Sequence, residues 1–387
     1  MRFSDFDTEA FLRDHWQKKP LLIRNPWASW TNPLEPDELA GLACEAEVES
    51  RLITQGRDAL KLEHGPLPES RFGQLGKHPW TLLVQAVDHH VPAVAALLQP
   101  FRFVPNWRVD DVMVSYATDG GGVGPHFDRY DVFLLQGLGK RRWQIGASCD
   151  EATELRPHAD LRLLAHFEAA DEWVLEPGDI LYVPPRVAHN GVAVGDDCMT
   201  YSIGFRAPSR RELIEDWSAH LLAGMADDEL YEDADLRAQD NPGEITAPAI
   251  ARLQAMVAEK LLDRDAFARW FGRQNSERKY PDVDWRPDHP LGIEDLRACL
   301  ADSLPLSRNP ASRFSFIRRN ADALTLFVDG ESFECVGETI AFAERICGED
   351  RLRLVGPIAS SATEAMILQL LNSGSVAVDR DDPEDAD

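Results

Sequence analysis

Six short strand-like segments between residues 110 and 206 constrain the fold more than any other feature of the chain. Turn-forming residues separate them, among them the glycines of 120–122 and the run Pro177-Gly178-Asp179. Short strands at this spacing predict an antiparallel barrel or sandwich. The six segments are residues 112–117, 132–136, 141–145, 173–175, 180–183 and 199–205.

Helical periodicity dominates on both sides of this block. Ser209 and Glu212 have the spacing of a capping box, which predicts a helix running towards residue 225. Asp329-Gly330 predicts the turn of a hairpin nearer the C-terminus. Further helices are expected near residues 4–16, 80–100, 250–261, 267–271, 293–300, 338–347 and 362–371, and further strands at 21–23 and 314–318.

These changes of pattern predict a mixed protein of several domains, as a length of 387 residues allows. A proline-punctuated linker around residues 281–290 separates the helical stretch from a small α+β module. We expect a catalytic β domain at 1–207, a helical region at 208–280, the α+β domain at 281–378 and an acidic tail at 379–387.

The charge balance narrows the choice of partner. The chain has 40 Lys and Arg against 66 Asp and Glu, a net charge of −26. Phosphate backbones are held by dense Lys/Arg patches, so direct nucleic-acid binding is not expected, whereas a basic protein would be attracted. Residues 276–387 carry 22 acids and 12 bases, a net 12 − 22 = −10, which favours a protein-interaction or structural role for the C-terminal domain.

Cysteine usage and the N-terminus predict a cytoplasmic protein. The six cysteines are scattered, without a Cys-x-x-Cys pair, so neither a disulfide framework nor a zinc knuckle is expected. The first residues carry charges without an apolar stretch, and the most apolar segment, 91–98, is too short to cross a membrane.

His126-Phe127-Asp128 is the centre of chemical interest. On an extended strand, residues i and i+2 point to the same face, so an imidazole and a carboxylate would lie side by side. A second imidazole would complete a two-His-one-carboxylate triad for Fe(II). His189, shortly after the strand at 180–183 and Pro184-Pro185, can supply it from a short connector. A second His-x-Asp tripeptide, His158-Ala159-Asp160, follows Arg156-Pro157 and reads as a solvated loop.

A 2-oxoglutarate cosubstrate would also need a cation for its distal carboxylate, and a bidentate Arg with a neighbouring hydroxyl serves best. Arg141 lies in Gly139-Lys140-Arg141-Arg142-Trp143, on the second strand after the His-x-Asp turn, and Ser115 lies in the strand before that turn. Lys140, Arg141 and Arg142 alternate faces, so at least one points outward, but the alternation does not choose among them.

Taken together, these motifs resemble the JmjC-type ribosomal oxygenases, in particular their bacterial arginine-hydroxylating branch. The resemblance extends along nearly all of the first two hundred residues, and the remainder is similar to the family in layout. Its carrying segments are HWQKKP at 15–20, GGGVGPHFDRYD at 120–131, GKRRW at 139–143, EPGDILYVPP at 176–185 and YSIGFRAP at 201–208.

The resemblance implies a cupin-type double-stranded β-helix, a helical dimerisation region and a C-terminal winged-helix-like domain. It implies that His126, Asp128 and His189 bind Fe(II), and that Arg141 with Ser115 binds 2-oxoglutarate. The implied reaction is hydroxylation of an arginine β-carbon in large-subunit ribosomal protein sixteen, with release of succinate and CO2. The implied enzyme is a homodimer.

Two other classes fit parts of the pattern. A cupin metalloenzyme that does not use 2-oxoglutarate would share the triad but would not depend on Arg141. A non-enzymatic ribosome-assembly factor would use the winged-helix domain and need no metal. The apolar residues at 253–261 fit a dimer interface or packing within one chain equally well.

Overall fold

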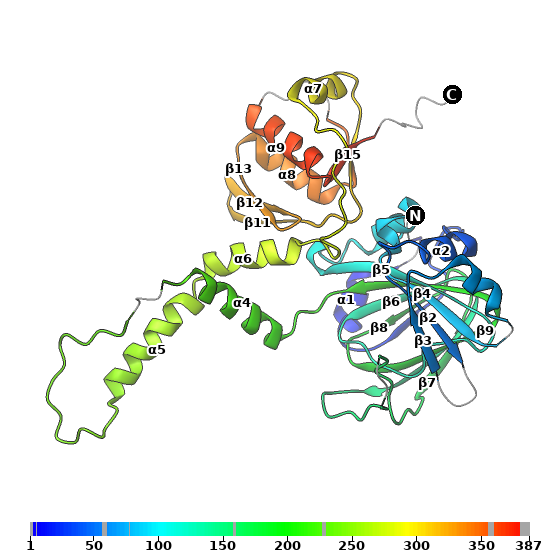
Figure 1. Cartoon of the computed structure of the whole chain (residues 1–387), viewed down its shortest axis with the longest axis horizontal. Coiled ribbons are helices and arrows are strands. Elements are labelled where there is room, and N and C mark those ends of the chain that lie inside the picture. Colours follow the sequence, from blue (N-terminus) through cyan, green and yellow to red (C-terminus); the bar gives the residue numbers. More distant parts are fainter. Residues whose placement is uncertain are drawn as a thin grey trace. The chain divides into compact units, whose positions relative to one another are not determined.

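The computed structural model describes residues 3–4, 6–55, 60–76, 78–157, 160–226, 230–354 and 360–379. The chain forms two compact units (Figure 1). Unit 1 contains residues 1–207 with the short segments 282–284 and 309–311, and unit 2 contains the rest. Within the described ranges, no helix is both long and apolar enough to cross a membrane.

Unit 1 is built on a nine-stranded sheet with the order β1-β8-β6-β9-β5-β4-β2-β3, and β7 pairs with β6. The strand pairings of this sheet are antiparallel throughout the described residues, as the sequence predicts. The strands are β1 Leu21–Ile23, β2 Ser50–Gln55, β3 Leu60–His64, β4 Trp80–Val84, β5 Val109–Ala117, β6 Asp131–Ser148, β7 Asp171–Leu175, β8 Ile180–Val183 and β9 Val187–Phe205. The helices are α1 Thr8–Asp14, α2 Pro36–Leu42 and α3 Pro92–Ala95, with 3-10 turns η1 Glu69–Gln74, η2 Val87–His89, η3 Ala96–Phe101 and η4 Asn106–Arg108.

Strands β6 and β9 form the longest pairing, and their alternation separates two buried faces. Phe133 and Leu135 point to one face, where they join an aromatic core that includes Phe11 and Tyr182. Val132 and Leu134 point to the other face and join a smaller apolar cluster with Trp143. We call this second face the inner face. Since successive side chains of a strand point to opposite sides, one strand serves both clusters.

Two expectations about the elements of unit 1 are wrong. Residues 80–100 do not form one helix, because 80–84 is strand β4 and only short helical turns follow. A short, fully buried apolar strand cannot be distinguished from a helix by periodicity, and Pro92 and Pro100 prevent a long helix. The segments 132–136 and 141–145 are also one strand, β6, whose register shifts between Gln136 and Lys140 where Gly139 takes φ +58°.

Unit 2 begins with the predicted helix, whose capping box forms between Ser209 and Glu212. It contains helices α4 Arg210–Gly224, α5 Ala247–Leu261, α6 Arg264–Ser276, α7 Ile293–Ala301, α8 Glu338–Gly348 and α9 Ser361–Asn372. Its strands are β10 Leu306–Arg308, β11 Phe314–Asn320, β12 Ala323–Val328, β13 Glu331–Val336, β14 Arg351–Leu352 and β15 Val376–Val378, in two three-stranded sheets. The hairpin β12–β13 turns at Asp329-Gly330 as predicted.

The C-terminal part of unit 2 has its own apolar core, to which α7, α8, α9 and β12 contribute buried side chains. Helix α5 differs, because none of its residues is buried. The apolar side chains that the sequence places along it are therefore exposed in the single chain.

Candidate metal and cosubstrate site

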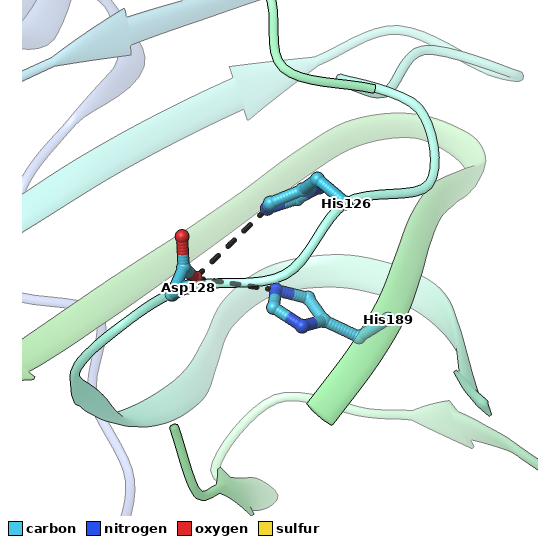
Figure 2. A group of neighbouring side chains, drawn as sticks. All are labelled: His126, Asp128 and His189. Carbon is cyan, nitrogen blue, oxygen red and sulfur yellow. Dashed lines mark ion pairs between the residues drawn. The ribbon is translucent and has the colours of Figure 1, made fainter. Parts of the chain in front are cut away.

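His126, Asp128 and His189 come together in unit 1 (Figure 2). The Asp128 Oδ2 atom lies 3.4 Å from His189 Nε2 and 4.0 Å from His126 Nε2. All three ligand atoms lie within 4.8 Å of one another. Adjacent donors around an ion with bonds of about 2.1 Å are roughly 3 Å apart, so small side-chain shifts would let these three residues hold one divalent ion.

The backbone fixes the two histidines as a pair. The His126 N–H donates to the His189 carbonyl at 3.0 Å, and the His189 N–H donates to the His126 carbonyl at 2.8 Å. His126 therefore lies on an extended connector that makes one isolated bridge. The sequence argument from the i, i+2 spacing had placed it in a regular strand. His189 is the third residue of β9, which corrects its expected place on a connector. Same-face projection of His126 and Asp128 survives because the connector is extended.

The other ring nitrogen of each histidine faces a backbone carbonyl. His126 Nδ1 lies 2.8 Å from the Gly124 oxygen, and His189 Nδ1 lies 3.0 Å from the Val187 oxygen. A carbonyl can only accept, so each Nδ1 carries a proton, and Nε2 is the ring atom of each histidine that is placed to bind a metal ion. This arrangement orients metal-binding imidazoles in proteins.

Burial and charge shift the pKa values of the three residues in different directions. Desolvation and the neighbouring His189 lower the pKa of His126, so its imidazole is neutral. Desolvation opposes ionisation of Asp128, but the hydrogen bond to His189 and the charges of both histidines lower its pKa. Desolvation would lower the pKa of His189, but the Asp128 carboxylate outweighs it and raises that pKa. The carboxylate thus attracts a cation to a buried site.

Arg141 provides a positive charge on the inner face of β6. It is 3% exposed, and its Nε and Nη2 atoms have no hydrogen-bond partner among the described residues. Lys140 and Arg142 are exposed, so the alternation left open by the sequence selects Arg141. Burying an uncompensated guanidinium is costly, and a ligand carboxylate would satisfy it.

Ser115 is also buried, at 3% exposure, and its hydroxyl makes only a 3.5 Å contact with the Thr200 carbonyl. Its position relative to Arg141 follows from the register. Ala193, the β9 partner of Arg141, packs against Ala117, which shares a face of β5 with Ser115. Strand β9 lies between β5 and β6 in the sheet, so Ser115 and Arg141 are on the two strands that flank it.

Two further side chains at the site were not predicted. Tyr130 lies two residues after Asp128, and desolvation with the charges of Asp128 and Asp111 raises its pKa well above the usual value. Trp143 lies with its ring centroid 5.8 Å from that of His189. The alternation that selects Arg141 also applies to Trp143, two residues further along β6, and could have indicated it. Of the second His-x-Asp tripeptide, His158 and Ala159 lie outside the described residues.

Two family models match the chain. A JmjC domain matches residues 96–213, and a ROXA-like winged helix matches residues 258–377. The second match confirms the winged-helix-like domain expected near the C-terminus. The first contains all five candidate site residues.

Curated relatives include enzymes that modify ribosomal proteins. The chain is 41% identical over 280 residues to the ribosomal protein uL16 3-hydroxylase of Escherichia coli K12, covering 72% of this chain and 74% of that protein. It is 41% identical over 265 residues to a probable ribosomal oxygenase of Haemophilus influenzae, covering 67% and 65%. The ribosomal oxygenase 2 of Bos taurus is more distant, with 28% identity over 202 residues and 48% and 42% coverage.

Solved structures agree with this assignment. An X-ray structure of E. coli ycfD has a TM-score of 0.89 and 34% identity, covering 98% of this chain and all of that one. The E. coli ribosomal oxygenase YcfD in complex with cobalt and 2-oxoglutarate has a TM-score of 0.84 and 34% identity, covering 97% and 99%. This chain combines an antiparallel β domain, a His-Asp-His group and a C-terminal winged helix. It belongs to the JmjC-domain ribosomal oxygenases.

Proposed function

We propose that this chain is an Fe(II)- and 2-oxoglutarate-dependent hydroxylase that oxidises the β-carbon of an arginine side chain in the large-subunit ribosomal protein uL16. One observation carries the proposal. A partly buried His-Asp-His group and a buried guanidinium with nitrogens unpartnered among the described residues lie in the same β domain. A metal site alone would fit many cupin enzymes, but a metal site with an inner-face Arg fits a cosubstrate that chelates at one end and is anionic at the other.

His126, Asp128 and His189 would hold the iron, which leaves three coordination positions for cosubstrate and dioxygen. Iron bound there would couple decarboxylation of 2-oxoglutarate to substrate hydroxylation, with succinate and CO2 as coproducts. Arg141 and Ser115 would hold the far carboxylate of 2-oxoglutarate.

The remaining residues of the inner face exclude water. Val132, Leu134, Ile145, Leu175 and Val183 are each at most 4% exposed and belong to one cluster with Trp143. A dry, apolar surround strengthens the pairing of Arg141 with a carboxylate and protects the reaction from solvent.

The charge of the chain supports a basic protein as substrate. Residues 101–150 contain His126, Asp128 and Arg141, and they hold six acids and six bases. Their net charge is zero, so the net charge of −26 comes from the rest of the chain. An anionic cosubstrate then meets a balanced segment, while the acidic exterior attracts a cationic ribosomal protein. The same acidity argues against direct nucleic-acid binding by the winged helix. The six cysteines all lie in the described residues and form no disulfide, which supports a cytoplasmic enzyme.

We further propose a homodimer that associates through the helical region. Exposed apolar side chains form a stripe along α5, and an exposed apolar surface is typical of an interface between protein chains. They are Ile250 at 51%, Leu253 at 44%, Met256 at 37%, Val257 at 60% and Leu261 at 39% exposure. The proposed division is a catalytic domain at 1–207, a dimerisation region at 208–280, a winged-helix domain at 281–378 and a tail at 379–387. The chain divides into its two compact units after residue 207, which supports the first of these boundaries.

The test is the intact mass of purified ribosomal proteins from cells with and without this enzyme. A gain of one oxygen on uL16, located to an arginine by fragmentation, is the expected result. Incubation of recombinant uL16 with enzyme, Fe(II) and 2-oxoglutarate should reproduce that gain and release one succinate per hydroxylation. An unchanged mass of every ribosomal protein, with no succinate formed, would refute the assignment.

A further inference from the structure

We propose that the indole N–H of Trp143 is a third hydrogen-bond donor for 2-oxoglutarate, acting on the same far carboxylate as Arg141. The inference rests on the proposed function and extends it to a residue that neither the metal triad nor the Arg141–Ser115 pair includes. Trp143 is a positioning residue in this account, because it orients the cosubstrate without taking part in the oxidation.

The first observation is that the buried Trp143 N–H lacks an acceptor among the described residues, whereas three other indoles have one. The Trp27 and Trp30 indoles donate to the carbonyls of Gly178 and Gly137, each at 2.9 Å. In unit 2, Trp217 donates to the Leu261 carbonyl at 3.2 Å. Trp143 is 5% exposed, yet its Nε1 has no acceptor among the described residues. A buried indole N–H normally finds a partner, and leaving it unsatisfied destabilises the fold.

The second observation is the place of the ring. The Arg141 guanidinium lies 5.7 Å from the ring centroid of Trp143, and the His189 ring centroid lies 5.8 Å away. Trp143 thus stands between the proposed carboxylate anchor and the proposed metal group. A five-carbon diacid that bridges the two must pass beside this ring.

The third observation is how the ring is held. Trp143 pairs across the strands with Gly191, and a Cβ at that glycine would lie 2.6 Å from the Cζ3 atom of the ring. The six-membered edge therefore packs on the bare Gly191 backbone. Nε1 lies on the opposite edge of the indole, directed away from β9. The missing side chain at Gly191 lets the ring occupy the site while its N–H stays available to a ligand.

Trp143 and Arg141 lie on the same face of β6, and each has buried hydrogen-bond donors without a described acceptor. Three buried donor atoms on these two residues, Trp143 Nε1 and Arg141 Nε and Nη2, have no described partner. A carboxylate has two oxygens and about four acceptor positions, enough to satisfy all three. One group on the ligand thus accounts for the whole set.

The test compares Trp143→Phe with wild type by calorimetric titration of the cobalt(II)-loaded full-length protein with 2-oxoglutarate and with succinate. Phe keeps an aromatic ring over Gly191 and removes only the donor. A hydrogen bond to a charged acceptor corresponds to about a tenfold to hundredfold change in affinity, so both ligands should bind at least about tenfold more weakly. Trp173→Phe, at the cross-strand partner of Trp143 on β7, is the matched control and should bind as wild type does.

The ligand-free melting temperature separates a binding role from a structural one. Trp143→Phe should melt at the same temperature as wild type or higher, because it removes an unsatisfied buried donor. If it fails to fold, the 15N-labelled wild-type protein gives the answer. One buried indole N–H should shift and exchange more slowly with solvent when 2-oxoglutarate is added, and the absence of any such change would overturn the inference.

The outcomes are distinct. Equal affinities of Trp143→Phe and wild type would overturn the role of the indole. Weaker binding of 2-oxoglutarate with unchanged binding of succinate would overturn the far-carboxylate assignment, because succinate keeps that end of the molecule and lacks the keto acid. Failure of the wild-type cobalt protein to bind 2-oxoglutarate would refute the proposed function itself.

Discussion

The backbones of His126 and His189 are hydrogen-bonded to each other in both directions, although the two residues are 63 positions apart in the chain. This two-way pair joins the connector before β6 to the start of β9. It sets the imidazoles with their ring centroids 4.3 Å apart before any ion binds. The metal group is therefore pre-organised by main-chain geometry, which is harder to lose by mutation than side-chain packing.

Removal of one imidazole should abolish metal binding and hydroxylation. His126→Ala deletes one of three ligands, and we expect no measurable oxygen gain on uL16 and no tight cobalt(II) binding by calorimetry. His166→Ala removes a histidine whose side chain is 88% exposed and should leave both measurements unchanged. A fully active His126→Ala variant would exclude His126 as a ligand.

Removal of the Arg141 charge should weaken 2-oxoglutarate binding and increase the stability of the ligand-free protein. Arg141→Met removes a buried guanidinium with unpartnered nitrogens, so the ligand-free protein should gain about 1–3 kcal/mol in free energy of unfolding by chemical denaturation. The same variant should lose 2-oxoglutarate binding. Lys140→Met alters an exposed cation that pairs with Glu176 and should change neither quantity by more than about 0.5 kcal/mol. A less stable Arg141→Met protein would mean that another group already compensates the charge.

Gly122 should not tolerate a side chain. A Cβ there would lie 2.4 Å from the Gly191 carbonyl oxygen, and a backbone atom cannot move away as a flexible side chain would. We expect Gly122→Ala to lower the free energy of unfolding by about 1–3 kcal/mol and to weaken metal binding. Gly73→Ala is the control, since a Cβ at Gly73 meets nothing within 4 Å. Equal melting temperatures for the two variants would contradict the close approach.

The pair Glu63–Arg71 should make stability depend on pH in the acidic range. Two hydrogen bonds of 2.9 and 2.7 Å from Arg71 lower the pKa of Glu63, against desolvation. A lowered carboxyl pKa stabilises the fold above the unfolded-state pKa of about 4.3, and that stability disappears as the pH falls through the folded-state pKa. Wild type should therefore exceed Glu63→Gln by about 0.5–1 kcal/mol at pH 7, with the gap closing below about pH 4. A gap that is constant with pH would point to packing instead.

A charge on the apolar stripe of α5 should prevent dimerisation. Val257→Asp places a carboxylate at a position that is 60% exposed in the single chain, so the fold should be unaffected while an interface there would lose affinity. Light scattering after size exclusion should show a dimer for wild type and a monomer for Val257→Asp. Val194→Asp, on β9 at 40% exposure, should remain dimeric. A monomeric wild type would refute the proposed assembly.

Much of the fold could be predicted because its elements carry local signals. The capping box at Ser209 and the turn at Asp329-Gly330 depend only on neighbouring residues, and both form as expected. Residues 80–84 could not be assigned, since a buried strand and a buried helix share the same apolar run. The continuity of β6 was also hidden, because Gly137 and Gly139 read as a break between strands and are in fact the site of its register shifts.

The candidate site also combines features that could be predicted from the sequence with features that could not. The spacing of His126 and Asp128 and the character of Arg141 were visible in the sequence, but the choice of Arg141 over Lys140 and Arg142 needed the burial of each side chain. Tyr130 carries no local signature of function, and Trp143 is marked only by the same alternation as Arg141. The packing of Trp143 on Gly191 follows from long-range strand register, which no short motif encodes.

The register shifts in β6 decide which cation the second half of this strand turns to the inner face. The relevant shifts lie between Gln136 and Lys140, before Arg141, and Ile145, four residues after Arg141, pairs with His189 of the metal group. Adding or deleting one residue between 136 and 140 would turn Arg141 outward and bring Lys140 or Arg142 to the inner face. A cation would remain inside, but at a different distance from the metal group and without its place beside Trp143. The bulges of one strand thus determine which cation the proposed cosubstrate would meet.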